Sequence, residues 1–289
     1  MTLPVIVGID GTAESLAAAD WAAEEALHRD LPLILLHAWG PQRLANVPLA
    51  LPPSEQEQAA ERLLEDAEKQ VRERHPGVRV TTELATGPEV TMLAARSNDA
   101  TMLVLGSRAL GPVMGFLVGS IGLKALKRVR CPVVLVRSRE RDGGTTGDEV
   151  VVGVQGADEE TASALSFAFE AAAARGAAVR AVRAWSLPTV FTFRPSTIRR
   201  ADEQGGIEEL ERQTLEEAVA PWRERYPQVP VVQDLGFGSA PEILLTASSH
   251  AQLLVIGCHV QPGGGRHIGA VGHAVLHFAD VPVALVGGE

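Results

Sequence analysis

The residues best suited to ligand chemistry lie between Gly106 and Ser120, in a run that reads GSRALGPVMGFLVGS. Glycine lets backbone amides approach a ligand closely. A helix predicted to begin at Ser120 would add unpaired N–H groups and the positive end of its dipole. Arg108 could add charge, and Ser120 a hydroxyl donor. This combination is suited to binding phosphate.

The same run has a plainer interpretation. Glycines before a helix often only form a tight turn, and Ser120 could simply be the N-cap of that helix. The chain has no G-x-x-x-x-G-K-[ST] phosphate loop, and no G-x-G-x-x-G fingerprint follows its first predicted strand. Composition alone leaves both interpretations open.

Strands alternate with helices around this run. We expect strands at 5–9, 33–38, 78–84, 102–105 and 133–136, and helices at 13–29, 54–74, 89–98 and 120–128. Ser54 and Glu57 predict a capping box at the start of the second helix. Alternation of this kind predicts a parallel sheet covered on both faces, with all carboxyl ends of the strands at one edge. Three segments should therefore meet there: 8–11, 37–39 and 106–120.

The sequence contains an internal repeat, because its second half resembles its first. Residues 4–39 and 149–185 both run from a strand through an Ala-rich helix to a second strand that ends in Ala-Trp. The segments MLVLG and CPVVLV of the first half recur as LLVIG and VPVALV in the second. A polar, Gly-rich linker, RSRERDGGTTGD, joins the halves. We expect two α/β domains, 1–140 and 148–289, each with a five-stranded parallel sheet and helices on both faces.

Composition excludes several classes of protein. The 289 residues are 46% hydrophobic but only 4% aromatic, which suits aliphatic α/β cores. A net charge of −10 argues against a nucleic-acid partner. The charge is uneven, at −2 for residues 1–145 and −8 for 146–289. No signal peptide or membrane span is predicted, and two cysteines are too few for a disulfide framework. These features favour a cytoplasmic protein without a membrane partner.

The repeated unit resembles the universal stress protein family, and the resemblance covers both halves. It rests on short motifs of the first half: VGIDG at 7–11, LHAW at 36–39, VLGSR at 104–108, and Gly119-Ser120. ATP-binding members of this family carry G-x2-G-x9-G-[ST]. Gly106 and Gly119-Ser120 keep that spacing, whereas Ala109 stands at the second glycine. Ala109 is harmless if its φ is negative and costly if its φ is positive.

The resemblance implies a flavodoxin-like fold of the adenine nucleotide alpha hydrolase-like type, with ATP and Mg²⁺ in the first half. Asp10 matches the acidic residue that contacts ribose or a phosphate-bound metal, and the backbone of Ile9 and Ala38 would border the adenine. The residues implied around the triphosphate are Gly106, Arg108, Ala109, Gly119, Ser120 and Ile121. The resemblance also implies that the halves pack through their last strands, and that two chains form a homo-oligomer.

The second half departs from the motif. Gln155 replaces the acidic residue, Val260 stands at the second glycine, and Ala270 replaces the closing serine. A β-branched residue resists positive φ, and alanine has no hydroxyl. We expect a degenerate half that supports the first. The alternative is an altered site that still binds nucleotide through backbone amides.

Other residues carry weaker signals. His273 and His277 are spaced like a metal-binding pair, but an amphipathic helix with two histidines is the favoured interpretation. No general base, nucleophile or arginine finger for phosphoryl transfer can be identified. We therefore expect an ATP-binding stress-response protein that acts as a nucleotide-dependent switch or adaptor on an unidentified protein partner, with slow ATP hydrolysis at most. Two rivals stay open: a scaffold that binds no nucleotide, and a nucleotide-hydrolysing or adenylate-transferring enzyme on the same fold.

Overall fold

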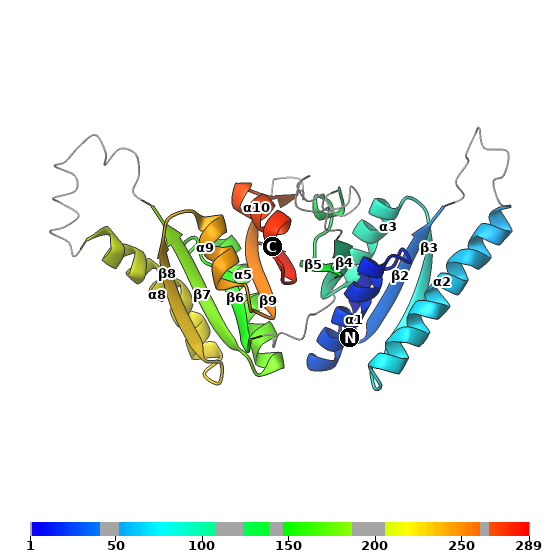
Figure 1. The fold of residues 1–289 in the computed structure, drawn as a ribbon, viewed down its shortest axis with the longest axis horizontal. Coiled ribbons are helices and arrows are strands. Elements are labelled where there is room, and N and C mark those ends of the chain that lie inside the picture. Colours follow the sequence, from blue (N-terminus) through cyan, green and yellow to red (C-terminus); the bar gives the residue numbers. More distant parts are fainter. Residues whose placement is uncertain are drawn as a thin grey trace. The chain divides into compact units, whose positions relative to one another are not determined.

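The computed structural model describes residues 2–40, 52–107, 124–138, 147–186, 206–260 and 266–288. The chain divides into two compact units, residues 1–142 with 261–267, and residues 143–260 with 268–289. Each unit is a parallel sheet with helices packed against it (Figure 1). The expected α/β class and the two tandem flavodoxin-like domains are confirmed.

The first unit follows the expected alternation of strands and helices. In chain order its elements are β1 (Val5–Gly8), α1 (Ala13–His28), β2 (Leu33–Trp39), α2 (Pro53–Arg74), β3 (Val80–Thr86), α3 (Glu89–Arg96), the 3₁₀ turn η1 (Ser97–Asp99), β4 (Met102–Ser107) and β5 (Val133–Arg137). The strand order is β3-β2-β1-β4-β5, with parallel neighbours. The order reverses between β1 and β4, and ligands of such sheets bind beyond the strand ends at this point.

The second unit repeats this topology. Its elements are β6 (Glu149–Gly153), α5 (Glu159–Arg175), β7 (Ala178–Trp185), α8 (Ile207–Arg225), β8 (Val231–Phe237), α9 (Ala240–Ala247), β9 (Leu253–Val260), α10 (Ala270–Phe278) and β11 (Val283–Gly287). The short β10 (Arg266–His267) lies in the stretch that belongs to the first unit. The order is β11-β9-β6-β7-β8, so β6 and β9 stand where β1 and β4 stand in the first unit.

Aliphatic strands and small helical residues build both cores. Strands β1, β4 and β5 are buried almost throughout, as strands covered on both faces must be. Helix α1 buries a stripe of alanines, which lets it approach the sheet closely. The turn after α1 contains Asp30 in the left-handed region, at φ 51°, and Gly176 adopts the same conformation, at φ 66°, after α5. The two units thus share even their turn geometry.

Two details of the sequence analysis are corrected by the structure. The capping box at Ser54 and Glu57 is wrong: α2 begins at Pro53, and its N-cap residue, Pro52, makes no side-chain capping bond. Proline suits the first helical position because its ring fixes φ near the helical value. Its missing N–H costs nothing there, since the first N–H groups of a helix have no partner within the helix. Strand β4 also extends through Ser107, so Gly106 is a strand residue and not the first residue of a loop. Among the described residues, no helix is both long and apolar enough to cross a membrane.

Candidate functional site

The carboxyl edge of the first unit brings together four of the predicted site residues. Ile9 and Asp10 follow β1 directly, Ala38 lies near the end of β2, and Gly106 lies near the end of β4. The amide of Ile9 donates to Leu36 of β2 at 2.9 Å. On the other side, Val7 is in register with Val104, and the same register continued for two residues sets Ile9 level with Gly106. Ile9 and Ala38 are buried, whereas Asp10 is exposed at the edge. The other predicted residues lie outside the described parts of the chain: Arg108, Ala109, Gly119, Ser120 and Ile121.

Asp10 organises the turn that leads into α1. Its Oδ1 accepts the amide N–H of Thr12 at 3.0 Å and the hydroxyl of Thr12 at 2.5 Å. Thr12 is the N-cap of α1, and its Oγ1 accepts the amide of Ser15 at 3.2 Å. The carboxylate therefore lies beside the amino end of a helix, where the helix dipole favours negative charge.

Two further side chains of this edge, His37 and Ser15, hold the backbone beside Asp10. His37 Nδ1 lies 2.6 Å from the carbonyl oxygen of Ile9, and the amide of Asp10 donates to Ser15 Oγ at 3.3 Å. The sequence analysis placed His37 at this edge but gave it no role. A lone histidine at a strand end forms no pattern, and only the register of β1 and β2 reveals its partner.

Gly106 has a packing role that its motif does not reveal. A Cβ at this position would lie 2.5 Å from the carbonyl carbon of Glu14 and 2.7 Å from the amide nitrogen of Ser15. Glycine thus lets β4 pass directly against the first turn of α1. The neighbouring Leu105 faces the other side of the sheet, against Gly8. A ligand at this edge would meet Gly106 through its backbone.

At the same edge of the second unit, polar side chains pair with one another and with the backbone. Arg183 stands in β7 at the position of His37 in β2, and its guanidinium donates to the carbonyl oxygen of Gln155. Arg183 also pairs with Glu211 of α8 at 2.5 Å. At the end of β9, the ring of His259 forms a hydrogen bond with the carboxylate of Glu160 in α5. One salt bridge and one histidine–carboxylate hydrogen bond therefore occupy the strand ends at which the first unit presents Asp10 and its turn.

Of the other second-half positions, Val260 ends β9 and Ala270 begins α10. Neither side chain can supply a charge or a hydroxyl to a ligand.

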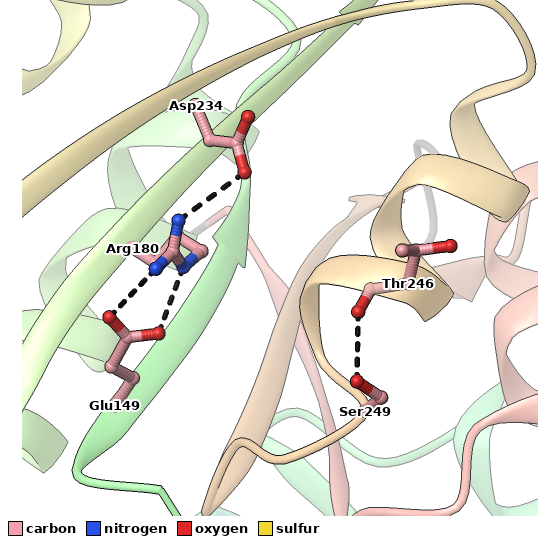
Figure 2. Close-up of polar contacts among 5 residues, drawn as sticks. All are labelled: Glu149, Arg180, Asp234, Thr246 and Ser249. Carbon is pink, nitrogen blue, oxygen red and sulfur yellow. Dashed lines mark hydrogen bonds and ion pairs between the residues drawn. The ribbon is translucent and has the colours of Figure 1, made fainter.

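The amino edge of the second unit contains a polar cluster and a hollow of ≈ 560 Å³. Figure 2 shows Arg180 between two carboxylates: its guanidinium donates to both oxygens of Glu149 at 2.9 Å and to Asp234 at 3.4 Å. The hydrogen bonds to Glu149 raise the pKa of Arg180 above its ordinary value. The last turn of α9 lines the hollow, and Ser249, just beyond that helix, donates its hydroxyl to the carbonyl of Thr246 at 3.0 Å.

This cluster is a rearranged version of an ion pair in the first unit. By strand register Glu83 is the counterpart of Asp234, and Ile34 is the counterpart of Arg180. In the first unit the arginine comes from the helix: Arg96, the last residue of α3, pairs with Glu83 at 2.5 Å. The last residue of α9 is Ala247, which lines the hollow. With the arginine on the strand and not on the helix, the carboxylate of Asp234 is still paired. The last residue of α9 is then the small Ala247.

The His, Cys, Asp and Glu side chains of the described ranges form no group of three or more that is arranged to hold a metal ion. Cys131 and Cys258 are both buried, and neither forms a disulfide. Burial raises the pKa of the Cys131 thiol to about 12, so this side chain is protonated at neutral pH.

Comparison with known proteins agrees with the repeated architecture. The family model "Universal stress protein family" matches residues 1–137 and 148–287. The chain belongs to the universal stress protein family, as a tandem member with two such domains.

Relatives with the same tandem arrangement occur in mycobacteria. "Universal stress protein Rv2623" of Mycobacterium tuberculosis is 35% identical, over 98% of this chain and 95% of that protein. "Universal stress protein Rv2005c" of the same species is 33% identical, over 96% and 95%. A crystal structure of a universal stress protein from Archaeoglobus fulgidus aligns over 98% of both chains with a TM-score of 0.73 and 15% identity, which shows the shared fold.

Proposed function

We propose that this protein binds ATP, together with Mg²⁺, at the carboxyl edge of the first unit, and that nucleotide occupancy switches its interaction with a protein partner. The observation that carries the proposal is the ordered Asp10 turn. It presents an exposed carboxylate beside the amino end of α1, next to the point where the strand order reverses.

The residues at this edge fit a nucleotide. Ile9 and Ala38 are buried at neighbouring strand ends, so their backbone groups can border an adenine ring. Asp10 would contact the ribose or a metal bound to the phosphates. The triphosphate would be held by residues that the family motif aligns with this site: Gly106, Arg108, Ala109, Gly119, Ser120 and Ile121. Mg²⁺ would neutralise phosphate charge beside the Asp10 carboxylate.

The asymmetry of the two units supports one nucleotide per chain. At the second edge the acidic residue is replaced by Gln155, whose carbonyl oxygen is bound by Arg183. The pairing of Arg183 with Glu211 compensates the positive charge that would otherwise attract phosphate. A nucleotide there would have to break these contacts without gaining a carboxylate.

A binding role is favoured over fast catalysis. The sequence offers no identifiable general base, nucleophile or arginine finger for phosphoryl transfer. We propose a cytoplasmic homo-oligomer that responds to nucleotide, with slow ATP hydrolysis as an incidental property.

The experiment is a calorimetric titration of Mg·ATP into the wild type, Asp10→Asn and Gln155→Ala. Asp10→Asn keeps an oxygen for Thr12 but removes the charge, so its affinity should fall at least tenfold. Gln155→Ala removes a side chain at the matching position of the second unit and should bind as the wild type does. Equal affinity in all three proteins would refute the assignment to the first unit, and no binding to a folded wild type would refute nucleotide binding altogether.

A further inference from the structure

We infer that His37 and Ser15 are positioning residues of the proposed nucleotide site, because they fix the peptide group that carries Asp10. The carbonyl of Ile9 and the amide of Asp10 belong to one planar unit. His37 binds its oxygen at 2.6 Å, and Ser15 binds its N–H at 3.3 Å. A peptide held at both polar ends cannot rotate, so the direction in which Asp10 leaves β1 is set before any ligand arrives. The identity of the ligand rests on the proposed function.

The chemistry of the two contacts fixes the roles of the side chains. A carbonyl oxygen only accepts, so Nδ1 of His37 must carry a hydrogen. Ser15 donates its single hydroxyl hydrogen to the carbonyl of Thr12 at 3.0 Å. The oxygen lone pairs of that hydroxyl are then directed to accept from Asp10. Ser15 is only 2% exposed, so water competes little for this bond.

The side-chain carboxylate of Asp10 is held in place as well as its backbone. Thr12, whose carbonyl holds Ser15, donates its own amide and hydroxyl to Asp10 Oδ1. Both the backbone and the side chain of Asp10 are therefore oriented by the first turn of α1, while His37 ties the Ile9 carbonyl to β2. Such preorganisation strengthens binding because less ordering remains to be done when the ligand arrives.

The second unit directs the equivalent residues elsewhere. Arg183, at the His37 position, reaches the carbonyl of Gln155, which belongs to the following peptide group. The third residue of α5 is Thr161, the counterpart of Ser15, and Asp158 caps its amide at 2.7 Å just as Thr12 caps that of Ser15. The two units therefore differ in the carbonyl group that the β2 or β7 side chain binds: that of Ile9 in the first unit and that of Gln155 in the second.

The test compares removal of each contact with its conservative replacement. His37→Leu removes the donor, whereas His37→Asn keeps an N–H near the position of Nδ1. Ser15→Ala removes the hydroxyl, whereas Ser15→Thr keeps it and copies the residue found in α5. We expect about fivefold weaker Mg·ATP binding for His37→Leu and Ser15→Ala, the usual loss for one hydrogen bond, and near wild-type binding for His37→Asn and Ser15→Thr.

The two contacts act on one peptide group, so their effects should not multiply. The double variant that combines His37→Leu with Ser15→Ala should bind little more weakly than either single variant. Arg183→Leu, the matched change in the second unit, should leave Mg·ATP affinity unchanged. Binding by His37→Leu equal to the wild type at matched thermal stability would overturn the inference, as would a double effect equal to the product of the single ones.

A measurement without ligand separates this inference from the proposed function. Nitrogen NMR of the free protein should show His37 protonated on Nδ1, and Asp10 should have a slowly exchanging amide. A His37 ring protonated on Nε2 alone would refute the hydrogen bond to the Ile9 carbonyl, and with it the inference, even if ATP binds. A wild type that fails to bind Mg·ATP would refute the proposed function and with it the positioning role, while the NMR result still decides whether the peptide is held.

Discussion

Gly106→Ala tests how tightly β4 packs against the first turn of α1. The new Cβ would lie 2.5 Å from the carbonyl carbon of Glu14 and 2.7 Å from the Ser15 amide nitrogen, whereas ordinary contact begins at 3.4 Å. All of these are backbone atoms, so no side-chain rotation can relieve the overlap. Helix α1 must move away from β4 by most of an ångström.

Gly257 of the second unit supplies the matched control. Its added Cβ would meet the carbonyl oxygen of Glu160 at 3.0 Å, a milder overlap than at Gly106. Neither glycine has a positive φ, so the cost is steric in both cases. Overpacking costs about 1–3 kcal/mol. Because its overlap is the closer one, Gly106→Ala should lower the free energy of unfolding by about 3 kcal/mol, the upper end of that range. Gly257→Ala should lower it by about 1 kcal/mol, the lower end.

Hydrogen exchange followed by mass spectrometry is the appropriate assay, because whole-chain denaturation would mix the two units. Peptides from β4 and α1 should exchange faster in Gly106→Ala, with β9 and α5 unchanged. Gly257→Ala should show the converse, with a smaller effect. Mg·ATP affinity should also fall in Gly106→Ala, because Ser15 moves with the helix. Equal protection of β4 in Gly106→Ala and wild type would refute the packing argument.

Other substitutions test the buried thiol and the polar clusters. Burial raises the pKa of Cys131 to about 12 from an ordinary 9.0, so its contribution to stability is fully present below pH 9 and is lost as the pH rises toward 12. Cys131→Ala should flatten that alkaline loss, and in a Cys258→Ser background iodoacetamide should label the thiol at pH 8 only after denaturation. Arg180→Ile should lower the free energy of unfolding of the second unit by about 1–3 kcal/mol, because Glu149 and Asp234 lose their half-buried partner. Adding Ala247→Arg should restore part of that stability by recreating the first unit's arrangement. If the β6 and β8 peptides of the double variant are no better protected from hydrogen exchange than those of Arg180→Ile, the comparison of the two clusters is contradicted.

The fold was predictable because its signals are local and occur twice. Aliphatic strands alternate with helical segments, and the Ala-rich helix recurs with its flanking strands in each half. The start of α2 was missed because Ser54 and Glu57 match a capping box while Pro53 already begins the helix. The capping-box pattern and a proline at the first helical position each predict a helix start. Without the geometry of the preceding chain, the sequence cannot decide between them.

The site was predictable only in part. Asp10 and its exposed position follow from a strand that ends in a Gly-rich turn. The contact between His37 and Ile9, by contrast, depends on the register of two strands, and the packing of Gly106 on α1 depends on an interatomic distance. The exchange of Arg96 for Arg180 involves residues on different elements of the two units. No single-sequence pattern contains this information.

The most direct test of the account is the number of Mg·ATP sites per chain, measured by calorimetry on the wild type and on the double variant Gly119→Val and Ser120→Ala. The account predicts one site per chain in the wild type and none in the variant, with both proteins folded by circular dichroism. Two sites in the wild type, or one site that survives in the variant, would contradict the assignment of nucleotide binding to the first unit alone.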